Sequence, residues 1–225
     1  MRGPEAPIGR RERSKQDKRE RIRAAARELF ALHGVGGVTT QQIADHADIA
    51  IGTLYLYAAT KAELLIMVQN QKFATAIDDG LAAAAAVKGT PEEVLALIRP
   101  VVTCLREHVE NGRTYLHELV FGDPAETYRR EGLDLAGRLE GGLSTLLARD
   151  EPISPGDAAT LARVITAIIH ISTTATIYID RSDEEVLTDI REQIQSILAQ
   201  HHRGAGRSAS GALVPGKEPP DRGGS

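Results

Sequence analysis

The sequence predicts an all-α protein of about nine helices. Helix N-terminal capping pairs, a Ser or Thr followed three residues later by Glu, Gln or Asp, recur at Thr39/Gln42, Thr60/Glu63, Thr90/Glu93, Ser154/Asp157 and Ser182/Glu185. Pro91 and Pro155 directly follow two of these capping residues, at the first helical position, where proline is favoured. No alternating apolar and polar run with hairpin turns occurs, so we expect no strands.

These signals divide the chain into a small N-terminal domain and a larger helical body. The expected helices are 15–33, 40–46, 50–58, 61–87, 91–109, 113–121, 125–149, 155–179 and 183–202. The first three form a domain over residues 15–61, and the others form a body over residues 62–202. The helix over 61–87 is a rod of ~39 Å that joins the two. Residues 1–14 and 203–225 lack an apolar face and are predicted to be disordered.

Charge is distributed unevenly between the two parts. Residues 1–61 hold eleven Lys and Arg against seven Asp and Glu, a net charge of +4, whereas the whole chain carries −4. The remainder therefore carries −8. A basic domain on an acidic body favours an approach to phosphates with that domain first. The alternative is that the arginines belong to a solvated terminus.

Composition excludes several classes of protein. The only cysteine, Cys104, allows no internal disulfide and fits a reducing cytoplasm. No cluster of Cys and His has zinc-ligand spacing, and we expect neither a metal nor a cofactor. No apolar run approaches the ~18 residues of a membrane span, and the basic N-terminus lacks the apolar core of a secretory signal. We therefore expect no membrane partner and a place in the bacterial cytoplasm, at the nucleoid when bound to DNA.

The segment from Thr39 to Ala58 predicts a helix-turn-helix motif. Thr39 and Gln42 cap the first helix, and Ile43 and Ala44 form its buried face. Asp48 lies in the turn, where it tolerates a left-handed backbone better than most residues. The second helix presents small and hydroxylated side chains, which suit close approach to a DNA groove.

These residues resemble the DNA-binding domain of the TetR (tetracycline-repressor) family of bacterial transcriptional regulators. The shared pattern comprises Ala26 to Phe30 with Gly34, then Thr39 to Ala44, Gly52 to Tyr57, and Lys61 with Leu64 and Leu65. Asp48 and Ala58 depart from it, since the family usually has Gly and an aromatic residue there. The resemblance implies DNA contacts by Thr40, Gln41, Ile51, Gly52, Thr53, Tyr55, Tyr57 and Lys61. The implied partner is double-stranded, palindromic operator DNA.

The resemblance also implies a homodimer formed by the last two helices. The helix over 183–202 has one apolar stripe, and the helix over 155–179 is apolar nearly all round. We predict an interface that contains Leu161, Ile165, Ile168, Leu187, Ile190, Ile194 and Ile197.

The resemblance further implies that the body binds a small-molecule effector. We predict a pocket lined by Cys104, His108, His117, Phe121, Tyr128, His170 and Thr174. With eight aromatic residues and no Trp in the chain, an aliphatic or modestly polar ligand fits better than a large flat one. The alternative interpretation is that these polar groups form ordinary hydrogen bonds in the core.

The function predicted is that of a dimeric, sequence-specific transcriptional repressor that an effector releases from its operator. The alternatives are a ligand-independent DNA-binding dimer and an activator. A helical enzyme is a remote third, because Cys104 and His108 could share one helix face but no third orienting group accompanies them. We therefore expect no enzymatic activity.

Overall fold

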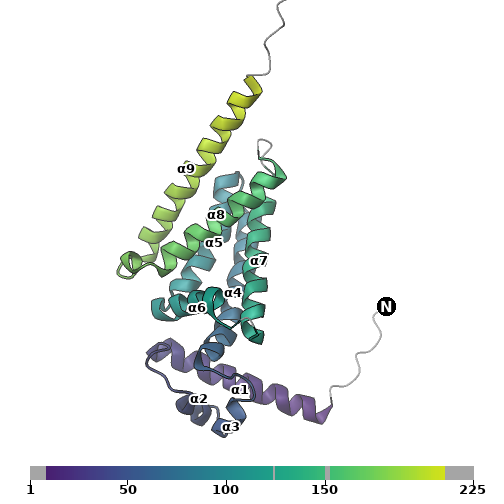
Figure 1. The fold of residues 1–225 in the computed structure, drawn as a ribbon, viewed down its shortest axis with the longest axis vertical. Helices are drawn as coiled ribbons and strands as arrows, with labels where there is room; N and C mark the ends of the chain where they lie inside the picture. The colour runs from purple at the N-terminus through teal and green to yellow at the C-terminus, as the bar shows by residue number, and fades with distance from the viewer. Residues whose placement is uncertain (1–8, 124, 150–152, 211–225) are drawn as a thin grey trace, which may run out of the picture.

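The computed structural model describes residues 9–123, 125–149 and 153–210, with side chains described up to residue 199. These residues form nine α-helices and one 3₁₀ helix and contain no strand, which confirms the predicted fold class. A small domain of α1 to α3 lies at one end of the molecule, and α4 runs from it into the body (Figure 1). The elements are α1 (Arg10–His33), α2 (Thr40–His46), α3 (Ile51–Leu54), α4 (Lys61–Ala85), α5 (Thr90–Arg106), α6 (Val109–Phe121), α7 (Thr127–Leu147), α8 (Pro155–Thr174), η1 (Thr176–Tyr178) and α9 (Asp183–Ser210).

Four of the five predicted capping pairs are present as hydrogen bonds. Thr39 and Gln42 form a complete capping box at α2, and the side chain of Thr60 accepts from the amide of Glu63 at α4. The amide of Asp157 donates to Ser154, and that of Glu185 to Ser182. At α5 the prediction fails, because Gly89 is the N-cap and Thr90 is already helical. Pro91 is then the second helical residue and has no amide N–H to be capped, and no side chain caps this end of the helix.

Two predicted disordered segments are partly helical. Helix α1 starts at Arg10, so residues 10–14 of the expected arm belong to it, while residues 1–8 lie outside the described residues. Helix α9 continues to Ser210, eight residues past the expected end, and residues 211–225 again lie outside. Both extensions lack an apolar face, but each adds turns to a helix already nucleated by packing, which costs far less than starting one.

Helix α4 is the central element of the body. It packs against α1 in the small domain and against α5, α6 and α7 in the body. Its residues 63–70 are all buried, including the polar Gln69 and Asn70. The amide of Asn70 donates to the carbonyl of Tyr128 at 2.8 Å, and its oxygen accepts from the hydroxyl of Tyr115 at 3.0 Å. These two bonds satisfy the buried amide and tie α4 to α6 and α7.

Most of the residues predicted for the dimer interface are buried within the chain itself. Leu161, Ile165, Leu187, Ile190 and Ile194 are at most 8% exposed, because α8 and α9 pack against each other and against the body within one protomer. Ile168 and Ile197 are half-buried against the same core. Up to residue 199, the buried apolar side chains of α9 form one stripe, and this stripe packs into the core of the chain. The second apolar face of α8 instead points outward, with Val164 39% and Ile171 58% exposed.

The described helices include no candidate for a membrane span, since none combines sufficient length with sufficient apolar character.

Candidate nucleic-acid interface

The turn between α2 and α3 has the geometry that the sequence predicts. Asp48 adopts φ 51°, the only positive value at a described non-glycine residue. This left-handed residue reverses the chain between the two helices. Helix α3 is shorter than the expected 50–58, because Tyr55 to Tyr57 form a tighter turn with i to i+3 hydrogen bonds. The motif still ends at Ala58, which is buried.

Arg21 on α1 holds this turn in place, a role that sequence reasoning missed. Its Nε donates to the carbonyl of Ala47 at 2.9 Å, and its guanidinium also bonds the carbonyl and the carboxylate of Asp48. In the sequence alone, Arg21 contributes only positive charge. Because its donors are used in these hydrogen bonds, Arg21 orients α2 and α3, and other cations must supply the contacts to phosphate.

Part of the predicted DNA-contacting set forms one exposed polar surface across α2 and α3. The hydroxyls of Thr40 and Tyr55 lie 3.1 Å apart, which joins the start of α2 to the end of α3. Gln41 is exposed and donates from Nε2 to Asp45 at 2.7 Å. Gly52 is exposed, and a Cβ there would meet no atom within 4 Å, so packing inside the protein does not require this glycine. Ile51 and Thr53 are half-buried beside it.

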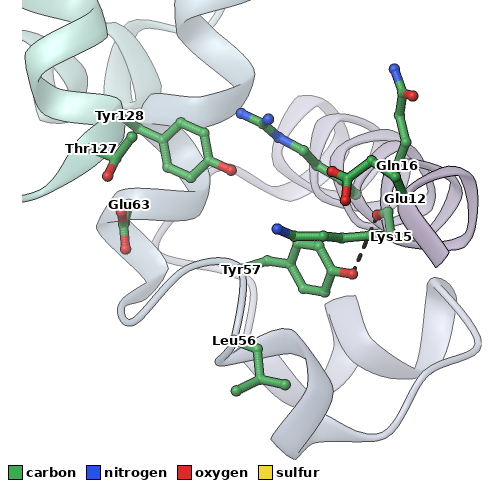
Figure 2. Close-up of a pocket in the computed structure, with 9 residues that line it drawn as sticks. Glu12, Lys15, Gln16, Leu56, Tyr57, Glu63, Thr127 and Tyr128 are labelled. Carbon is green, nitrogen blue, oxygen red and sulfur yellow. Dashed lines mark hydrogen bonds between the residues drawn. The ribbon is translucent and has the colours of Figure 1, made fainter. Parts of the chain in front are cut away.

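Tyr57 and Lys61 are instead bonded to the domain's own backbone. The hydroxyl of Tyr57 donates to the carbonyl of Lys15 on α1 at 3.3 Å, and Figure 2 shows the ring directed toward that helix. Nζ of Lys61 donates to the carbonyl of Val38 at 2.9 Å. An ammonium group has three protons, so Lys61 retains donors for a phosphate. The single hydroxyl proton of Tyr57 is already donated to the carbonyl of Lys15 on α1.

Four of the seven predicted pocket residues lie together. His117 and Phe121 on α6 and His170 and Thr174 on α8 line one cavity of about 540 Å³, which we call the α6/α8 groove. The rings of His117 and Phe121 are 5.0 Å apart. Burial lowers the pKa of His170, which favours its neutral form. The groove is completed by Val109, Glu110, Arg113, Thr114 and Ile179.

The other three predicted pocket residues lie elsewhere. Cys104 lines a groove between α4 and α5, and Tyr128 lines a cavity of about 430 Å³ between α1 and α7 (Figure 2), where the guanidinium of Arg19 lies 5.3 Å from its ring centre. His108 faces Gly34 of the small domain. The prediction is wrong here because it places Cys104 and His108 on one helix over 91–109. Helix α5 ends at Arg106, so His108 turns away from the helix that carries Cys104.

The separation of Cys104 from His108 also bears on thiol chemistry. Burial raises the pKa of the Cys104 thiol to about 11. A nucleophilic cysteine needs a lowered pKa, so this thiol is in the opposite state.

Comparison with known proteins agrees with a helix-turn-helix DNA-binding class. Residues 22–68 match the model described as bacterial regulatory proteins, tetR family. Over 82 residues the chain is 33% identical to the HTH-type transcriptional repressor KstR of Mycolicibacterium smegmatis, a match to 36% of this chain and 40% of that protein. It is 33% identical over 60 residues to KstR of Mycobacterium tuberculosis, 27% of each chain. The chain thus matches less than half the length of these relatives.

The fold is similar to that of solved regulators along most of the chain. FadR of Thermus thermophilus, a TetR family transcriptional repressor in complex with lauroyl-CoA, superposes with a TM-score of 0.64 at 21% identity over 92% of this chain and 100% of that one. FadR of Bacillus subtilis in complex with stearoyl-CoA gives 0.57 at 19% identity over 78% and 96%. The match to the tetR family model thus covers residues 22–68, and these solved regulators share the fold along most of the chain.

Proposed function

We propose that this protein is a homodimeric repressor that binds a palindromic operator through α2 and α3 and leaves it when a small molecule binds the body. The exposed polar surface of Thr40, Gln41, Gly52 and Tyr55 carries the proposal. Gln can bond an adenine edge through two hydrogen bonds, and Thr and Tyr hydroxyls suit phosphates and base edges. The names of the KstR relatives support repression.

Basic side chains on α1 supply the charge that DNA binding needs. Arg10, Arg11, Arg13, Lys15 and Lys18 are exposed, and none has an acidic partner among the described residues. These cations can therefore neutralise phosphates without first breaking an ion pair.

Selection of duplexes from a randomised pool tests the DNA-binding proposal. We expect enrichment of an inverted repeat, because two identical domains related by a two-fold axis contact two identical half-sites. Affinity measured by fluorescence anisotropy should fall steeply as salt rises. The double variant Gln41→Ala, Tyr55→Phe should lose the preference for the selected sequence. A pool that remains random after repeated rounds would refute the proposal.

The α6/α8 groove supports an amphiphilic effector with an acidic group. Val109, Phe121 and Ile179 offer apolar surface, and Arg113 lines the groove without an acidic partner among the described residues. An apolar chain of the effector can lie on this apolar surface, and its acidic group can pair with Arg113. The acyl-CoA ligands of the two FadR proteins belong to this chemical class.

Thermal unfolding with lauroyl-CoA as the probe tests this site. A ligand that binds only the folded protein stabilises it by RT ln(1 + [L]/Kd), so the melting temperature should rise with concentration. Arg113→Gln should reduce the rise, whereas Arg191→Gln on α9 should leave it unchanged. Equal rises in both variants would place the anion site elsewhere, and no rise in the unmodified protein would favour a different effector class or the ligand-independent alternative.

A further inference from the structure

Asn111, near the start of α6, joins the body directly to the DNA-binding domain. Its side chain is 5% exposed, and both ends of its amide bond to backbone of that domain. Nδ2 donates to the carbonyl of Phe30 in the last turn of α1 at 2.8 Å, and Oδ1 accepts from the amide of Val35 at 2.7 Å. A buried amide with two such bonds fixes the relative position of the segments that it joins.

Glu110, Gly34 and Gly36 also hold the loop after α1 close to α6. Oε1 of Glu110 accepts from the amide of Gly36 at 3.0 Å. A Cβ at Gly34 or at Gly36 would collide with the Glu110 carboxylate. Gly34 also has φ +68°, a backbone conformation that residues with a side chain rarely adopt. The loop over residues 34–39 therefore lies close against α6, and the positive φ of Gly34 favours glycine at that position.

This loop lies between two helices of the body. On one side Asn111 and Glu110 of α6 hold its first residues, and on the other Lys61 of α4 holds the carbonyl of Val38. The loop leads directly into Thr39, the N-cap of α2. A displacement of α6 relative to α4 must therefore distort the segment that positions α2.

The same helix forms one wall of the α6/α8 groove. Residues 109, 110, 113, 114, 117 and 121 of α6 line it, so Glu110 belongs both to the groove and to the contact with Gly36. Helix α6 has thirteen residues and moves as a short rod, because its backbone bonds resist bending. A ligand in the groove that displaces α6 would therefore also displace Asn111.

We infer that α6 carries the effector signal to the DNA-binding domain through Asn111, as a second connection beside α4. This inference rests on the proposed function, since it assigns a route to the proposed regulation. A ligand that moves α6 away from α4 pulls the loop over 34–39 and changes the orientation of α2 and α3. Asn111 is a positioning residue and touches neither DNA nor ligand.

A groove-filling substitution tests the route without a known effector. Thr174→Trp inserts bulk between α6 and α8, and Gln195→Trp, in a separate groove between α5 and α9, is the matched control. We would measure affinity for a duplex selected by the unmodified full-length protein, alone and in combination with Asn111→Ala. Thr174→Trp should weaken binding between about fivefold and 150-fold, the usual range of allosteric coupling. In the Asn111→Ala background its effect should shrink to less than about twofold, because contacting sites are not additive.

Hydrogen exchange at residues 34–36 gives a readout that does not depend on DNA. Thr174→Trp should accelerate exchange there when Asn111 is present and have no added effect when it is absent, and Gln195→Trp should change neither. If Asn111→Ala fails to fold, Asn111→Asp keeps the acceptor for Val35 and loses the donor to Phe30. Equal effects of Thr174→Trp in both backgrounds, or none in either, would overturn the inference. Failure of the unmodified protein to select any duplex would instead overturn the proposed function, and the exchange experiment would still decide the coupling.

Discussion

Gln41 offers the sharpest test of base recognition at the level of single residues. Its side chain is exposed on α2, and its nitrogen donates to Asp45 at 2.7 Å. We expect it to exchange this bond for a base edge, so Gln41→Ala should relax the preference at one base pair in each half-site and cost ~1 to 3 kcal/mol there. Binding to the selected duplex and to its single-base variants measures the effect. Gln195→Ala on α9 is the control, and an unchanged preference at every position would remove Gln41 from the recognition surface.

His170 makes stability depend on pH in a defined direction. Burial lowers its pKa in the folded protein below the ordinary 6.5, so the unfolded chain binds the proton more readily. The unfolding free energy should therefore fall as pH drops from 6.5 toward the lowered pKa and gain nothing from this group above 6.5. His170→Gln should flatten that part of the profile in urea titrations. A steeper profile in His170→Gln would contradict the assignment.

At the level of elements, the sequence predicts helices well where their signals are local. The capping bonds of Thr39, Thr60, Ser154 and Ser182 depend on residues three apart, and the five helices predicted from capping pairs all start within one residue of the expected position. Helix ends are less accurate. Tyr57 leaves the helical path and bonds α1, forty-two residues away, and α5 ends at Arg106. These ends depend on tertiary contacts, which no local pattern contains.

The N-terminal extension of α1 gives a prediction at the same scale. Arg10, Arg11 and Arg13 are helical and exposed. Their joint replacement by Gln, which keeps a good helix former at each position, should weaken binding to all DNA sequences alike. The slope of log K against log salt should flatten by about 0.9 for each phosphate that the variant no longer neutralises. Replacement of Arg138, Arg149 and Arg163 on the body by Gln removes the same net charge and is the control. An unaltered slope would show that this end of α1 lies away from DNA.

At the scale of the whole molecule, the sequence does not show which surface covers each apolar face. The stripe of α9 predicts a contact with a second subunit, whereas Ile190 and Ile194 are completely buried in their own protomer. Likewise, His117 and His170 line one groove as predicted, but Tyr128 lies against Arg19 of α1. Periodicity shows that a face is apolar, and only the packing of the whole chain decides what covers it.

The outward face of α8 is therefore where we expect the second subunit to bind. Val164 and Ile171 are 39% and 58% exposed, and the exposed Ala167 and half-buried Ile168 lie between them along the helix. Two copies related by a two-fold axis would bury this face against itself, since an isologous contact pairs one surface with its own copy. Ile171→Glu places two like charges near that axis and should convert the dimer to a monomer, measured by sedimentation velocity across a range of concentrations.

The same substitution should also act on DNA binding, because one domain bound to a half-site loses the contribution of its linked partner. We expect Ile171→Glu to bind a single half-site about as well as the unmodified protein does, and to lose its advantage on the complete inverted repeat. Leu32→Glu, at a position 67% exposed on α1, introduces the same charge away from α8 and should leave the protein dimeric. A dimer that survives Ile171→Glu and Val164→Glu together would place the interface on another surface, and the exposed face of α8 would then need a different partner.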